Sequence, residues 1–151
     1  MKLLHPYRAI GFAILDYIVS LLFMLLFGGY VSARVPQDAY LLNYFFYWGM
    51  LGILVTAPLF TFLYFRTKIV SINAKAGFLF GVTIFVVALF LDLLFSSFVI
   101  LLSGERFSHI FFLYRQPLFW VSILETFALA ALTAEWIRKR RLKVAPLTKS
   151  S

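Results

Sequence analysis

The feature that most constrains this chain is a succession of four long apolar blocks, at about residues 10–31, 44–65, 77–102 and 117–137. A membrane-spanning helix needs about 20 residues, because the hydrocarbon layer is ~30 Å thick and each residue rises ~1.5 Å. Helices are required because lipid offers no hydrogen-bond partners to an open backbone. The pattern therefore predicts an all-α fold, an integral membrane bundle of four transmembrane helices in one domain that covers residues 1–151.

The composition supports this interpretation and narrows the chemistry. Hydrophobic residues make up 63% of the chain and charged residues 13%, whereas soluble domains average roughly half and a quarter. There is no cysteine, which excludes disulfides and thiolate metal sites. Both histidines, His5 and His109, lie outside the blocks, and the sequence contains no HExxH, P-loop or GxSxG motif. We expect no cofactor, no metal and a function other than catalysis; an enzyme that uses Glu105 or His109 on lipid is a weaker alternative.

The basic residues predict the orientation. Of the 14 lysines and arginines, 11 lie before the first block, between the second and third, or after the fourth. Cytoplasmic loops carry this excess, so both termini should be cytoplasmic, in a plasma membrane that we expect to be a bacterial cytoplasmic membrane. The net charge of +8 is then explained without nucleic-acid binding. We expect residues 138–151 to form a basic tail that contacts anionic lipid head groups, through Arg138, Lys139, Arg140, Arg141 and Lys143.

Three acidic residues fall well inside the predicted spans, Asp16, Asp92 and Glu125, whereas Glu135 is two residues from the end of the fourth span. A carboxylate in hydrocarbon costs at least a few kcal/mol, so such a group faces other helices, binds a proton or pairs with a cation. Counting from the outer ends places Asp92 and Glu125 at similar depths, where they could meet and share a proton if the third and fourth spans are neighbours. Asp16 should lie nearer the cytoplasm, apart from the other two. Three roles are open: a structural neutral acid, a proton or cation path, and a contact with another subunit.

The third span has a face of small residues. Gly77, Gly81, Ala88 and Ser96 fall with Asp92 within about 100° of arc at 100° per residue. Gly77 and Gly81 form a GxxxG pair, a spacing that lets helix backbones approach closely. We therefore expect this face to be a packing seam that includes Asp92.

Other features leave alternatives open. Val31-Ser32-Ala33 resembles a signal-peptidase site, so the first span could be a cleaved signal peptide. Pro58 removes a backbone hydrogen bond and should kink the second span. The apolar loop from about 103 to 116 is either a helix lying in the outer interface or a docking surface.

The function predicted from these features is that of an accessory or assembly partner, which acts through helix–helix contacts with another membrane protein or in a homo-oligomer. It depends on the small-residue face, the apolar loop and the lack of catalytic motifs. The alternative is a small proton- or cation-coupled transporter or channel that uses the intramembrane carboxylates Asp92 and Glu125.

Overall fold

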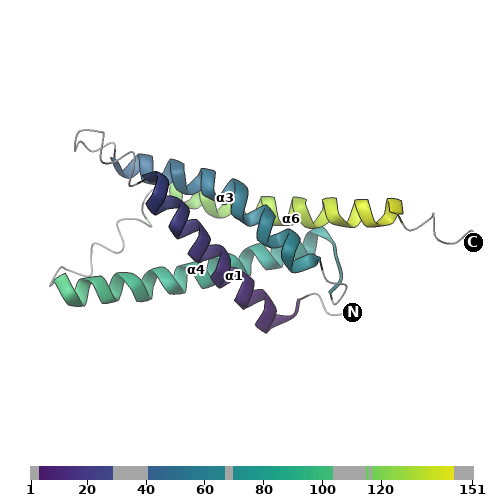
Figure 1. The fold of residues 1–151 in the computed structure, drawn as a ribbon, viewed down its shortest axis with the longest axis horizontal. Coiled ribbons are helices and arrows are strands. Elements are labelled where there is room, and N and C mark those ends of the chain that lie inside the picture. The colour runs from purple at the N-terminus through teal and green to yellow at the C-terminus, as the bar shows by residue number, and fades with distance from the viewer. Residues whose placement is uncertain (1–3, 29–40, 67–69, 104–114, 116, 145–151) are drawn as a thin grey trace, which may run out of the picture.

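The computed structural model describes residues 4–28, 41–66, 70–103, 115 and 117–144 (Figure 1). These residues form four long helices, α1 (Pro6–Phe23), α3 (Leu41–Phe65), α4 (Ala74–Ser103) and α6 (Pro117–Val144), and a π-helix, η1 (Met24–Gly28), which continues α1. All four helices are long and apolar enough to cross a membrane. Within the described part of the chain the fold is all-helical, as predicted, and it is compatible with a membrane helical bundle.

The ends of the helices follow local rules. Pro6 and Pro117 begin α1 and α6, where the missing N–H of proline is no loss. At the start of α4, the side-chain oxygen of Asn73 accepts a hydrogen bond of 2.8 Å from the backbone N–H of Ala76, an N-cap arrangement. α6 continues to Val144, beyond the predicted end at 137, so the first part of the basic segment is helical.

α1 and α6 each pack against both α3 and α4, whereas α3 and α4 make few contacts with each other. Figure 1 shows α1 crossing α4, and the C-terminal end of α4 diverging from α3. α3 continues through Pro58. The possible cleavage sequence at 31–33 and most of the apolar loop, with Glu105 and His109, lie outside the described residues.

An aromatic core joins the helices where α3 ends and α4 begins. Tyr64, Phe65 and Phe80 are fully buried, and the rings of Tyr64 and Phe80 stack with centroids 4.4 Å apart. Small residues from α1 and α6 complete the core and let these helices approach the rings. The buried cluster comprises Ala9, Ala13, Tyr64, Phe65, Val70, Ala76, Phe80, Ile84, Ala134 and Ile137.

The other half of α4 is largely uncovered. Phe90, Phe95 and Phe98 are each 60% exposed, and Leu101 is 76% exposed. The tightly packed part of the bundle is therefore at the end that holds the aromatic core, and the two ends differ in how closely the helices meet.

Candidate functional site: the polar contacts of helix α1

One polar contact lies between α1 and α3. Asp16 is only 5% exposed, and Thr56, which faces α1 from α3, is 2% exposed. The Thr56 hydroxyl interacts with the Asp16 carboxyl and lies 2.9 Å from the Ser20 hydroxyl. The Oδ1 atom of Asp16 is buried and has no hydrogen-bond partner among the described residues. This contact thus places three oxygen-bearing side chains together and leaves one carboxyl oxygen unsatisfied.

The sequence of α1 explains why Asp16 faces inward. Ala9, Ala13, Asp16 and Ser20 follow each other at intervals of four, three and four residues, which places them on one helix face. Ala9 and Ala13 are fully buried, so this face is the one that packs against the other helices. Asp16 is carried into the interior by the small residues one and two turns before it.

Glycines on α3 complete the close contact. A Cβ atom built on Gly52 would lie 3.2 Å from a ring carbon of Phe23, and one on Gly49 would lie 3.6 Å from the Met24 sulfur. Small residues at a helix crossing let the backbones approach. α1 and α3 therefore meet closely one to two turns before Thr56 along α3. This approach keeps the hydroxyls of Ser20 and Thr56 within hydrogen-bonding distance of each other.

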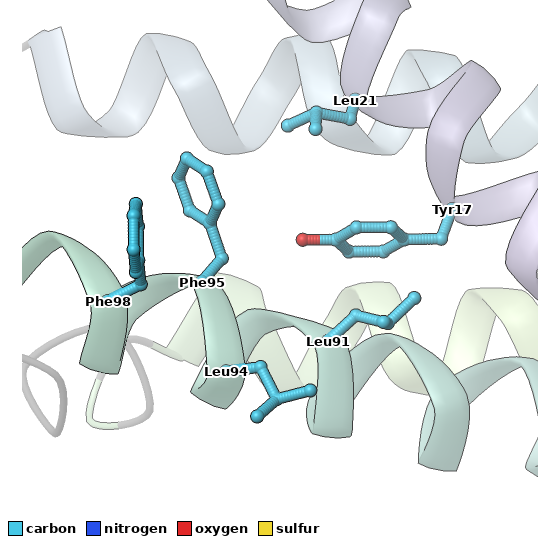
Figure 2. A pocket seen from close by; sticks show the side chains of 6 residues that line it. All are labelled: Tyr17, Leu21, Leu91, Leu94, Phe95 and Phe98. Atoms are coloured by element: carbon cyan, nitrogen blue, oxygen red, sulfur yellow. The ribbon is translucent and has the colours of Figure 1, made fainter.

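A second polar contact lies between α1 and α4. The Tyr17 hydroxyl donates a hydrogen bond of 2.7 Å to Oδ1 of Asp92, and both side chains are partly exposed. Beside them is an open groove of about 320 Å³. Figure 2 shows the Tyr17 ring extending from α1 beside Leu91, with its hydroxyl directed toward Phe95. The groove is lined by Tyr17, Leu21, Leu91, Leu94, Phe95 and Phe98.

The paired glycines of α4 face α6. A Cβ atom on Gly77 would lie 2.5 Å from the carbonyl oxygen of Ala130 and 2.6 Å from the Cβ of Ala134. On Gly81 it would lie 3.1 Å from the Cα of Phe127. The α4–α6 contact is thus a backbone-to-backbone approach that only glycine allows at position 77. Ala88 and Ser96, further along α4, are partly exposed.

Asp92 and Glu125 are not brought together. α4 and α6 are neighbours, but the hydrogen bond of Asp92 is made with α1, and none joins it to Glu125 among the described residues. Asp92 lies three turns beyond Gly81, and at this level the partner of α4 is Tyr17 of α1. Glu125 is partly exposed, and its Oε2 atom is buried without a hydrogen-bond partner within the described part of the chain.

Asp16 lies closer to Asp92 than we expected, since its neighbour Tyr17 contacts that residue directly. Residue counts along two helices give their relative depth only where the helices are parallel. Because α1 crosses α4, the middle of α1 reaches the C-terminal half of α4. Asp16 and Asp92 therefore both lie at contacts of α1, whereas Glu125 lies on α6.

Several basic residues of the C-terminal segment have partners within the protein. Arg138 donates two hydrogen bonds to Glu135, of 2.8 and 2.6 Å. The guanidinium of Arg140 lies 4.1 Å from the ring centre of Trp136, a cation–π contact. Lys139 is exposed, and the side chain of Lys143 lies outside the described part of the structure.

Two arginines bind the C-terminal end of α3. Arg141 donates hydrogen bonds of 2.8 and 2.9 Å to the carbonyls of Phe65 and Arg66. Arg8 approaches the carbonyl of Leu63 at 3.4 Å. The last carbonyls of a helix lack intrahelical donors and carry partial negative charge, so both cations stabilise this end. Arg141, which we expected to contact lipid, is thus held by α3.

Sequence reasoning missed Tyr17, Ser20 and Thr56. The spacing of small residues in α1 was a usable signal for Ser20, because it repeats the pattern that identified the glycines of α4. Nothing in the local sequence distinguishes Tyr17 or Thr56 from other tyrosines and threonines in the spans. Their importance comes from the opposing helix.

Comparison of the chain with protein-family models, with curated proteins and with solved structures found no match. Among the described residues, no three histidine, cysteine or acidic side chains are grouped so that they could hold a metal ion.

Proposed function

We propose that this chain is a four-span membrane protein with both ends on the cytoplasmic side of the plasma membrane, and that it serves as an accessory or assembly partner of another membrane protein. The aromatic core supports the orientation. It joins the start of α1, the end of α3, the start of α4 and the last turns of α6, and these are the helix ends next to basic residues. The positive charge therefore gathers at one end of the bundle, as the positive-inside rule requires.

The observation that carries the assembly role is the partly exposed Tyr17–Asp92 pair beside the open groove. An ionisable group in a span normally faces protein rather than lipid, because lipid cannot solvate it. Here α1 and α4 cover the pair only in part, and Leu94 and Phe95 beside it are 53% and 60% exposed. A helix of a partner protein laid along the groove would complete the cover.

The apolar lining of the groove favours a helix contact over an aqueous path. Apart from the Tyr17 hydroxyl, the side chains that line it are leucines and phenylalanines. Apolar walls suit packing against another transmembrane helix, whereas an ion path requires polar groups along its length.

The chain offers a direct test because it has no cysteine. Phe95→Cys on the groove and Leu132→Cys on α6, which is 67% exposed, each introduce one thiol. We expect the first variant, labelled with a short thiol-reactive photocrosslinker in native membranes, to give a defined product with one partner, and the second to give none. Gentle purification of the tagged protein with mass spectrometry then identifies the partner. Equal crosslinking at both positions, or none at either, would contradict an interface at the groove.

A second function is favoured by a different observation. Asp16 is buried with one unsatisfied carboxyl oxygen, which is the arrangement expected of a proton- or cation-coupled transporter or channel. Flux into proteoliposomes that hold the purified chain tests it. Flux lost in Asp16→Asn but retained in Glu125→Gln would support transport through α1, and absence of flux in the native sequence would exclude it.

A further inference from the structure

We infer that Asp16, Ser20 and Thr56 form a binding site for a single monovalent cation, a proton or a sodium ion, within the contact of α1 and α3. The site does not depend on the assembly role. It supplies the binding step that the transport alternative requires, and it is tested by binding alone, so that a bound cation without flux would leave the inference intact.

The geometry provides the ligands. Asp16 and Ser20 are one turn apart on the same face of α1, and Thr56 faces both from α3. All three side chains bind through oxygen, the ligand type that hard cations prefer. The carboxyl Oδ1 atom is buried and has no hydrogen-bond partner among the described residues. A buried acceptor left unsatisfied destabilises the fold, and more so when it is charged.

The charge balance fixes the valence. One carboxylate stands at the contact, and neither hydroxyl carries charge. A single positive charge neutralises the group, whereas a divalent ion would leave a net charge in a low-dielectric interior. No lysine or arginine lies in α1 beyond Arg8 or in α3, so these two helices do not supply the charge at this level.

Other titratable groups are nearby on the packed helices. Tyr17 and Asp92 form the hydrogen-bonded pair on the α4 side of α1, and Tyr64 of α3 accepts a hydrogen bond from the backbone of His5. Both tyrosines are neutral at physiological pH. Glu125 and Glu135 lie on α6, and Asp92 is the carboxyl that is hydrogen-bonded to α1 itself. It is therefore the appropriate control.

The test measures the thermal unfolding of the purified full chain in detergent. Sodium chloride is exchanged for choline chloride at constant ionic strength, and in a second series the pH is varied without sodium. We expect the unfolding midpoint to rise with sodium concentration or to fall as the pH rises, because an uncompensated Asp16 carboxylate destabilises the α1–α3 contact. The series that responds identifies the cation.

Two variants make the result specific. Asp16→Asn should abolish the response, while Asp92→Asn should retain it. Thr56→Val keeps the shape of the side chain and removes one oxygen ligand, so about tenfold more cation should be needed for the same shift, as the loss of one such bond predicts. The inference is overturned if neither series changes the midpoint of the native sequence, or if Asp16→Asn responds as the native sequence does. If Asp16→Asn does not fold, the inference is overturned when the unfolding midpoint of Thr56→Val depends on sodium and pH as that of the native sequence does.

Discussion

Replacing Gly77 by alanine tests the backbone contact between α4 and α6. The added Cβ would lie 2.5 Å from a backbone oxygen of α6 and 2.6 Å from the Cβ of Ala134, where ordinary contact begins at 3.4 Å. The two helices must therefore separate locally by about 1 Å, a gap that already forfeits a quarter to a half of each dispersion contact. In lipid, packing of this kind is a main source of helix association, so little else offsets the loss.

The magnitude follows from two opposing effects. Overpacking costs about 1–3 kcal/mol, and the upper end applies here because the obstructing atoms belong to a helix backbone. Alanine has the higher helix propensity, so replacing glycine by alanine stabilises a helix interior by about 1 kcal/mol. We expect Gly77→Ala to lower the free energy of unfolding by about 2 kcal/mol. At Gly81 the closest atom is 3.1 Å from the new Cβ, so a shift of a few tenths of an ångström suffices and the net change should be near zero.

Gly11 is the matched control, since a Cβ on this glycine of α1 would meet nothing within 4 Å. Gly11→Ala should therefore stabilise the protein by up to about 1 kcal/mol. Unfolding in mixed micelles with increasing sodium dodecyl sulfate, followed by circular dichroism, ranks the three variants. If Gly77→Ala is as stable as Gly11→Ala, the α4–α6 seam is looser than these distances imply and the reasoning is refuted.

Three further contacts are probed with the same unfolding measurement. Tyr17→Phe removes the donor of the bond to Asp92 and should cost about 1–2 kcal/mol; no loss would indicate that the pair is not formed. Phe80→Ala opens a cavity in the aromatic core and should cost about 3–5 kcal/mol, whereas Phe90→Ala, at a ring 60% exposed, should cost much less. Arg141→Ala removes the donor to the carbonyls of Phe65 and Arg66 and should cost about 1 kcal/mol. A variant as stable as the native sequence would contradict this capping role.

The helices were predictable because length and apolar content leave few other outcomes for such blocks. Their ends were less predictable where two criteria conflict. The apolar pattern predicts that the fourth span ends before Arg138, where charge begins. Arginine, lysine and leucine are good helix formers, however, and α6 continues to Val144. The apolar pattern reports where a helix can meet lipid, and helix propensity decides where it stops.

The neighbours of each polar residue were not predictable, because a helical wheel gives a face without saying which helix lies opposite. Gly81 and Asp92 share a face of α4, yet the first meets α6 and the second meets Tyr17 of α1. The difference arises from the divergence of α4, a tilt that is set by the whole bundle.

Asp16 and Tyr17 show the same limit within two consecutive residues. They point about 100° apart on α1, and this angle places the carboxyl in the closed contact with α3 and the hydroxyl beside the open groove with α4. A buried contact admits only a small occupant such as a cation, whereas an open groove of leucines and phenylalanines admits another helix. The two proposals thus follow from one difference: the contact of α1 with α3 is buried, and the groove between α1 and α4 is open. The polar residues of α1 alone do not predict this difference, because it depends on the helices that lie opposite.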